Sequence, residues 1–139
     1  IGMGVGPNQG DEGWWSYPRD GSRGCWEDDV FEFKADGTFT MDLGADTWLE
    51  GWQGVASEGC GAPVAPHVSA DHTYSFNASA MELTVNGDGA YVVLAKAHNS
   101  GEDGNSGGSI MYHVTSVTET EMILDLNYGN WWRLYLKKN

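Results

Sequence analysis

Short segments in which apolar and polar residues alternate are the feature that most restricts the fold of this chain. Phenylalanines recur at every second position of the segment 29–34, and apolar residues do the same in 38–42. A period of two indicates β-strands with one buried face, and helical spacing is hard to find. The connection Ala35-Asp36-Gly37 carries a glycine that favours a tight turn, so the two segments are predicted to form a hairpin.

The alternation continues along the chain and predicts about eight antiparallel strands. The six further segments contain Tyr74 and Phe76; Met81, Leu83 and Val85; Ala90 to Leu94; Ile110, Tyr112 and Val114; Met122, Leu124 and Leu126; and Trp132, Leu134 and Leu136. A meander of eight strands removes its exposed edges by closing on itself. We therefore expect an all-β, up-and-down barrel of the lipocalin type in a single domain spanning residues 1–139. A two-sheet β-sandwich fits the pattern nearly as well.

Net charge and hydropathy exclude several classes of partner. Twenty acidic and seven basic residues give a net charge of -13, which would repel nucleic acid and anionic membranes. No apolar run approaches the ~20 residues that span a bilayer, so no membrane span is predicted. Any export signal is expected to have been removed or to lie upstream.

Two cysteines, Cys25 and Cys60, permit one disulfide bond. Closing a loop of about 36 residues would stabilise the fold by ~3 to 4 kcal/mol in the chain-entropy model. A pair of buried free thiols is the alternative. Neither cysteine belongs to a Cys-x-x-Cys pair of the kind that binds zinc.

Two stretches interrupt the strand pattern, and binding residues concentrate on such loops of a rigid β scaffold. The first runs from residue 43 to 71 and is too long to be a simple turn. The second, 97–109, is rich in glycine, serine and asparagine. Functional residues are therefore expected to concentrate in these two stretches, of which the second is expected to be a mobile loop.

Tryptophans are the main functional clue, because the flat faces of sugars stack on indole rings beside polar groups that fix hydroxyls. Trp48 and Trp52 are the leading candidates among seven tryptophans, since they lie four apart beside Glu50 and Gln53. The alternative is that both rings plug one end of the barrel as core. Two further rings complete the candidate set, Trp15 and Trp26.

Several strings in the chain resemble a lipocalin-like accessory domain of secreted polysaccharide-degrading systems of marine bacteria. That domain type is attached to family 16 glycoside hydrolases and occurs in surface proteins of glycan-utilisation loci. The strings are Thr47-Trp48-Leu49-Glu50-Gly51-Trp52-Gln53-Gly54, Cys60-Gly61-Ala62-Pro63-Val64-Ala65-Pro66-His67, and residues 13–16, 25–29, 33–39, 87–91 and 131–134. The resemblance covers nearly the whole chain. It implies an extracellular setting close to polysaccharide, and it supplies no catalytic residues.

No catalytic apparatus is predicted. Glu27, Asp29 and Glu32 match the spacing of the catalytic strand motif of family 16 glycoside hydrolases, whose mechanism needs two carboxyl groups across a cleft. Those enzymes need a domain roughly twice this size. They also carry an aliphatic residue where this chain has Asp28. The motif is therefore interpreted as a chance match in an acidic chain.

No metal or other cofactor is predicted either. Two groups offer oxygen ligands for calcium, Asp42, Asp46 and Glu50, and Glu102, Asp103 and Asn105. Neither follows the spacing of an EF-hand loop, so a solvated acidic surface is the simpler interpretation. The four histidines show no zinc spacing. We expect His67 to anchor the long loop by a hydrogen bond and His98 to face solvent.

The sequence thus predicts a non-catalytic carbohydrate-binding accessory domain, secreted or on the outer surface, for extracellular polysaccharide such as a β-glucan. Its expected partners are the polysaccharide and a parent or partner glycoside hydrolase. A carrier of one small apolar ligand is an alternative, because an eight-stranded barrel can enclose such a ligand. A structural spacer without a ligand is another.

Overall fold

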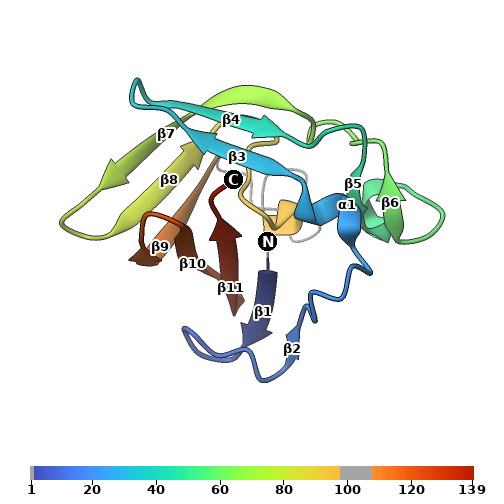
Figure 1. The fold of residues 1–139 in the computed structure, drawn as a ribbon, viewed down its shortest axis with the longest axis horizontal. Helices are drawn as coiled ribbons and strands as arrows, with labels where there is room; N and C mark the ends of the chain where they lie inside the picture. Colours follow the sequence, from blue (N-terminus) through green and yellow to red (C-terminus); the bar gives the residue numbers. More distant parts are fainter. Residues whose placement is uncertain (1, 98–107) are drawn as a thin grey trace. The chain divides into compact units, whose positions relative to one another are not determined.

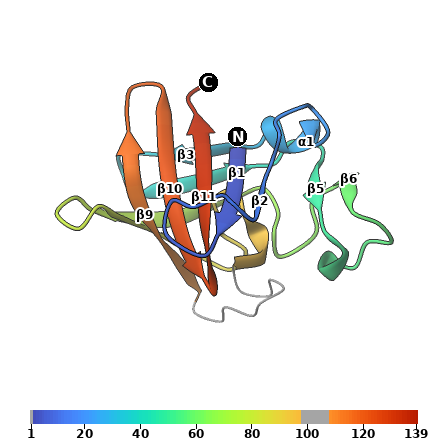
Figure 2. The same cartoon turned by 90° about the horizontal axis from the view of Figure 1, so that it is seen from below.

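The computed structural model describes residues 2–97 and 108–139 and shows an all-β protein. Figures 1 and 2 show the strands and their labels. Nine strands form one sheet in the order β2-β1-β11-β10-β9-β8-β7-β4-β3, and β5 and β6 form a small second sheet. The strand pairs with a defined register are antiparallel. The predicted fold class is therefore confirmed at the level of an antiparallel all-β protein.

The strands are two to nine residues long, and each helix is about one turn long. The strands are β1 (Gly2–Gly6), β2 (Trp15–Ser16), β3 (Val30–Phe33), β4 (Thr38–Asp42), β5 (Thr47–Leu49), β6 (Gly59–Gly61), β7 (Ala70–Asn77), β8 (Glu82–Asn86), β9 (Ser109–Val117), β10 (Glu121–Tyr128) and β11 (Asn130–Lys137). The helices are α1 (Gly24–Glu27) and the 3-10 helices η1 (Gly51–Gln53) and η2 (Ala95–Ala97).

The chain divides into two compact units. The first unit comprises Ile1–Asp20, Phe76–Leu83 and Met111–Asn139, and the second comprises Gly21–Ser75 and Thr84–Ile110. The prediction of a single domain over residues 1–139 stays a prediction.

In the first unit, β1 lies beside β11 and presents glycine at every second position. Gly4 pairs with Arg133, and Gly6 pairs with Trp131. A methyl group on Gly6 would lie 2.7 Å from the Asp11 carbonyl oxygen, so the connection from β1 to β2 packs directly on this glycine face. Glycine is required here because any side chain would push that connection away. The sequence analysis did not predict β1, since glycine gives no hydrophobic alternation.

A buried ion pair lies on the same face of the first unit. Asp125 on β10 stands opposite Arg133 on β11, and two guanidinium nitrogens of Arg133 donate to its carboxylate at 2.8 and 2.9 Å. Thr115 and Gln9 also donate to this carboxylate. Asp125 is completely buried, and its four hydrogen bonds compensate for the lost hydration.

In the second unit, the predicted hairpin of residues 29–42 is present as β3 and β4. Phe33 pairs with Phe39 across the strands, and their rings stack with centroids 4.9 Å apart. Gly37 adopts a φ of +90°, the conformation expected of a turn glycine. Phe39 and Met41 are buried, as the period of two predicted.

The predicted strand at residues 90–94 is wrong. This segment is fully buried but irregular, and Val93 has a φ of +63°. Its polar groups find partners without a sheet: the Trp26 indole donates to the Val93 carbonyl at 3.1 Å, and the Leu94 N–H donates to the Val92 carbonyl at 2.7 Å. A segment covered on all sides is apolar throughout whether or not it is a strand, so periodicity cannot separate the two cases.

The long stretch from residue 43 to 71 is more regular than predicted. It contains β5, η1 and β6, and β7 begins within it. The second predicted interruption, residues 97–109, largely coincides with residues 98–107, which lie outside the described residues. This range includes His98, Glu102, Asp103 and Asn105.

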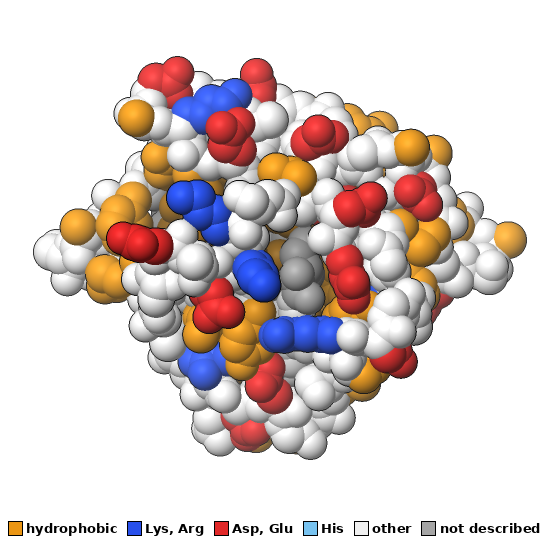
Figure 3. All heavy atoms as spheres, in the orientation of Figure 1, with side chains coloured by type: hydrophobic (Ala, Val, Ile, Leu, Met, Phe, Trp, Pro, Cys, Tyr) orange, Lys and Arg blue, Asp and Glu red, His pale blue; other side chains and the backbone are white. Residues whose placement is uncertain are grey.

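None of the helices in the described part of the chain combines the length and apolar character needed to cross a bilayer. Acidic and basic side chains are intermixed over the face of the molecule shown in Figure 3.

Candidate functional site

The candidate site is the segment from β5 to β6, residues 47–61, in the second unit. β5 and β6 pair antiparallel, with Trp48 opposite Cys60. Helix α1 contacts both strands, and Figures 1 and 2 show it beside them. The segment carries four of the six residues that the sequence predicted for ligand binding: Trp48, Glu50, Trp52 and Gln53.

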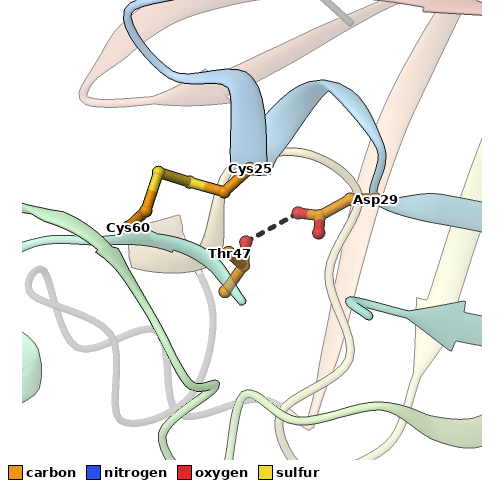
Figure 4. The surroundings of a disulfide bond; sticks show 4 residues. All are labelled: Cys25, Asp29, Thr47 and Cys60. Atoms are coloured by element: carbon orange, nitrogen blue, oxygen red, sulfur yellow. Dashed lines mark hydrogen bonds between the residues drawn. A yellow bond between two sulfur atoms is a disulfide. The ribbon is translucent and has the colours of Figure 1, made fainter. Parts of the chain in front are cut away.

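A disulfide bond fixes this segment to α1. Cys25 on α1 and Cys60 on β6 are bonded, with their Cα atoms 5.9 Å apart (Figure 4). The disulfide that the sequence permitted is therefore confirmed. The bond joins positions 35 residues apart, so it restricts the unfolded chain as well as the hairpin.

Trp48 is half-buried and is held by a cation. The guanidinium carbon of Arg23 lies 4.2 Å from the centroid of the Trp48 ring and 5.4 Å from that of Trp26. A cation over an indole face is attracted by the ring quadrupole, so this contact fixes the ring. The Trp48 Nε1–H is buried and has no hydrogen-bond partner among the described residues.

Trp26 is buried, with 5 % of its surface exposed, and its indole N–H donates to the Val93 carbonyl. A ring this deeply buried presents almost no face to a sugar. The burial removes Trp26 from the set of stacking rings and makes it a support beneath Arg23.

Trp52 is also half-buried, and a network on η1 orients it. Its indole N–H donates to the Glu50 carboxylate at 2.7 Å, and Lys96 lies 3.9 Å from the other oxygen of that carboxylate. Glu50 and Gln53 form a capping box, in which the Gln53 side chain accepts from the Glu50 N–H at 2.9 Å. The rings of Trp52 and His67 meet edge to face, with centroids 5.4 Å apart.

His67 lies in the loop that follows β6. It is buried, and its ring contacts both Trp52 and Tyr91. Its backbone N–H donates to the Val64 carbonyl at 3.0 Å. The loop after β6 therefore contacts the Trp52 ring of the candidate site through His67.

Trp15 belongs to the first unit, so it is not grouped with Trp48 and Trp52. It lies on β2 with 38 % of its surface exposed, and its neighbour Trp14 is 60 % exposed. These are the most exposed indoles of the described residues.

The three carboxylates of the hydrolase-like spacing do not share one strand face. Glu27 lies on α1, Asp29 lies between α1 and β3, and Glu32 lies on β3 beside Lys34, with 3.6 Å between their charged atoms. The geometry that the catalytic motif requires, a run of carboxylates along one strand, is not present at these positions.

Among the described residues, one group of three side chains brings potential metal ligands within 4.8 Å of one another: Cys25, Asp46 and Cys60. Both sulfur atoms belong to the disulfide, so they are not thiolates and do not bind a metal as such. Asp42 and Glu50, which the sequence analysis considered with Asp46 as calcium ligands, are not part of this group.

Asp29 is a feature of the site that the sequence analysis considered only as a catalytic acid. Its carboxyl group is buried and accepts a hydrogen bond from the Thr47 hydroxyl at 2.7 Å (Figure 4). The pKa of Asp29 is raised from 3.8 to about 7. Burial raises it most, the Thr47 hydrogen bond lowers it, and the charges of Asp28, Asp42 and Asp46 also raise it. The sequence signal that could have identified Asp29 was its position directly before β3.

A scan of protein-family models gave no match to this chain, and a search of curated proteins gave none either. The resemblance to accessory domains of family 16 glycoside hydrolases therefore rests on the sequence strings alone. The assignment of a function depends on the geometry of the site.

Proposed function

We propose that this chain is a non-catalytic carbohydrate-binding module in which Trp48 and Trp52 stack against the sugar rings of an extracellular polysaccharide. The observation that carries the proposal is that both indoles are half-exposed on one short segment and are held in place from several sides. Neither ring is sealed in the core, which the alternative of a barrel plug would require.

Fixed rings favour binding because a ligand that stacks on them does not have to order them first. The disulfide and Arg23 hold Trp48, while Glu50 and His67 hold Trp52. Aromatic rings with one polar edge are the usual contacts for sugars, whose faces are apolar and whose hydroxyls are polar.

The geometry refines the roles of Glu50 and Gln53. Their side chains are bonded to each other's backbone and, for Glu50, to the Trp52 indole. We assign Glu50 and Gln53 the role of positioning Trp52. Contact with the sugar is assigned to the faces of the indole rings. Trp15 is a separate candidate ring on the first unit.

The setting of the module is part of the proposal. A disulfide is stable in an oxidising compartment, which supports a secreted or outer-surface location. A glycoside hydrolase as parent or partner, and a β-glucan as the glycan, are proposed on the sequence resemblance. Closure of the strands into a lipocalin-like barrel, with a two-sheet sandwich as the alternative, is proposed on the strand pattern of the sequence.

The alternative of a small-ligand carrier needs an empty interior. In the second unit, Phe33 stacks on Phe39 and meets Tyr74 edge to face with centroids 5.2 Å apart. Side chains packed in this way fill the space between strands, which favours a surface site over an internal one.

Affinity electrophoresis in gels that contain laminarin, a soluble β-glucan, tests the proposal. The mobility of the wild-type protein is expected to fall in the gel, and Trp48→Ala and Trp52→Ala should each restore it. Trp14→Ala is the matched control, because it removes an exposed indole outside the segment and should bind as the wild type does. Unchanged wild-type mobility across a panel of neutral glucans would contradict the proposal.

A further inference from the structure

Asp29 combines deep burial with an unsatisfied oxygen. The residue is 6 % exposed, and one carboxyl oxygen accepts the hydrogen bond from Thr47. The other oxygen is buried and has no hydrogen-bond partner among the described residues. An ionised carboxylate in such a place loses its hydration without full compensation, so the charged state is strongly disfavoured.

The charges around Asp29 add to this effect. Asp28 follows α1, Asp42 ends β4 and Asp46 precedes β5, and each of them repels a negative charge on Asp29. In the part of the chain that the structure describes, no lysine or arginine forms an ion pair with Asp29. The folded protein therefore stabilises Asp29 when the carboxyl group carries a proton or a bound cation.

The geometry favours a proton over a cation. A calcium ion needs several oxygen ligands gathered around one point. Asp29 belongs to no group of three potential ligands among the described residues, and Asp46 lies instead against the disulfide sulfurs. A proton needs no such arrangement, because the carboxyl group holds it alone.

The position of Asp29 links its protonation to the candidate site. The disulfide of Cys25 with Cys60 and the hydrogen bond of Asp29 with Thr47 tie the same two stretches of chain together (Figure 4). Thr47 is the first residue of β5 and directly precedes Trp48. The disulfide is permanent under oxidising conditions, so the hydrogen bond is the reversible one of the two ties.

We propose that Asp29 and Thr47 form a proton-operated latch, in which the start of β5 stays docked on Asp29 while the carboxyl group is neutral and is released when the group ionises. Ionisation strengthens the hydrogen bond that Thr47 donates, but the cost of burying the charge next to other carboxylates outweighs that gain. The latch itself does not depend on sugar binding. Its consequence for the ligand, tighter binding at acidic than at alkaline pH, rests on the proposed function.

The direction of the pH effect follows from the two states of Asp29. The pKa of about 7 in the closed state lies above the ordinary value of 3.8, so the closed state binds the proton more tightly than the open one. The latch is therefore fully effective at pH values below the ordinary pKa of 3.8, and it is lost as the pH rises through the closed-state pKa of about 7. Over this interval, opening is expected to become about tenfold more frequent for each pH unit.

Hydrogen exchange of the β5 and β6 amides, without any glycan, tests the latch. The rates are compared at about pH 5 and about pH 8 after correction for the intrinsic pH dependence of exchange. Opening is expected to increase by at least ~10-fold in the wild type. Asp29→Asn, which is neutral at both values, should show no increase. Asp36→Asn is the matched control, because it removes an exposed aspartate from the β3–β4 turn and should behave like the wild type.

Three results of the exchange experiment would overturn the latch. The first is a wild-type opening frequency that does not change with pH, and the second is an equal pH dependence in Asp29→Asn. The third is slower exchange in calcium than in chelator for the wild type but not for Asp29→Asn, which would make the counter-charge a cation. If Asp29→Asn does not fold, NMR titration of the wild-type Asp29 carboxyl decides, and a midpoint below about 5 overturns the latch.

A glycan experiment separates the latch from the proposed function. Loss of laminarin binding at every pH, with normal pH-dependent opening, would contradict the proposed function and leave the latch intact. Normal binding with a flat opening profile would contradict the latch alone.

Discussion

The guanidinium group of Arg23 covers one face of the Trp48 ring, with its central carbon 4.2 Å from the ring centroid. Arg23 also contacts the ring of the buried Trp26, so the three side chains form one packed group beside the disulfide. A sugar that stacks on Trp48 therefore has to use the opposite face of the ring or displace Arg23. The covered face gives the ring a fixed orientation before any ligand arrives.

Replacing Arg23 by methionine should destabilise the protein. Methionine keeps an unbranched apolar stem but removes the charge over Trp48, so we expect a loss of about 1 kcal/mol in the free energy of unfolding. Urea denaturation measures the loss. Lys34→Met is the control, because the Lys34 side chain forms a half-exposed ion pair with Glu32 and, among the described residues, covers no aromatic ring. Equal losses in the two variants would show that the contact with Trp48 contributes nothing specific.

The hairpin of β3 and β4 was predictable because its sequence and its environment agree. Phe39 and Met41 point to one buried face, the intervening positions point outward, and Gly37 supplies the positive φ of the turn. Local preference and burial select the same conformation there, so alternation alone identifies the strands.

Residues 90–94 show why other parts were not predictable. A buried irregular segment and a buried strand have the same apolar composition, and only the partners of their backbone groups distinguish them. Those partners include the indole of Trp26 and the sulfur of Met41, which accepts from the Tyr91 N–H at 3.3 Å. Both are remote in sequence, so no local pattern reveals them.

The candidate site was predictable only in part, because some of its residues depend on contacts with residues that are remote in sequence. Trp48 and Trp52 were identified because they interrupt the strand pattern beside polar residues. Arg23 and the Asp29–Thr47 pair were not identified, since their roles depend on the disulfide that brings α1 next to β5. The burial of Trp26 likewise depends on contacts with the segment 90–94.

Removing the disulfide should destabilise the protein strongly. In the chain-entropy model, a bond between positions 35 residues apart contributes about 4 kcal/mol. The double variant Cys25→Ser with Cys60→Ser should therefore unfold at a clearly lower denaturant concentration than the wild type. Reduction of the wild-type protein serves as an independent control, and it should give the same midpoint. A shift of less than about 1 kcal/mol would contradict this role.

Alanine at position 89 should disrupt the second unit. Gly89 has a φ of +76°, and a methyl group there would overlap the backbone carbonyl oxygen of Pro66. We expect Gly89→Ala to cost at least ~2 kcal/mol, because a strained φ and a clash with backbone add together. Gly51→Ala is the control, since a methyl group at that position would meet none of the described residues within 4 Å apart from its chain neighbours, and its φ is not positive. Circular dichroism during thermal unfolding would compare the two, and equal midpoints would contradict the clash.

Asp125 should give the protein an acid sensitivity that is opposite in sign to the effect of Asp29. Burial alone would raise the pKa of Asp125, but hydrogen bonds from Arg133, Thr115 and Gln9 and the charge of Arg133 outweigh it, so the pKa is lowered. A carboxyl group with a lowered pKa stabilises the folded state at pH values above its ordinary pKa of 3.8. This stabilisation is lost as the pH falls through the lower, folded-state pKa.

Asp125→Asn separates this ion pair from the other acidic groups. The amide keeps the shape of the carboxylate but leaves the partly buried Arg133 without its counter-charge, so we expect a loss of roughly 2 to 3 kcal/mol at neutral pH. The difference between wild type and variant should shrink as the pH falls below about 4, because the wild-type carboxylate then takes up a proton and also loses its charge. Asp88→Asn removes an exposed charge and should change stability by less than about 0.5 kcal/mol. Urea denaturation across this pH range measures all three proteins. A difference between wild type and Asp125→Asn that stays constant down to about pH 2 would contradict a contribution from the ionised pair.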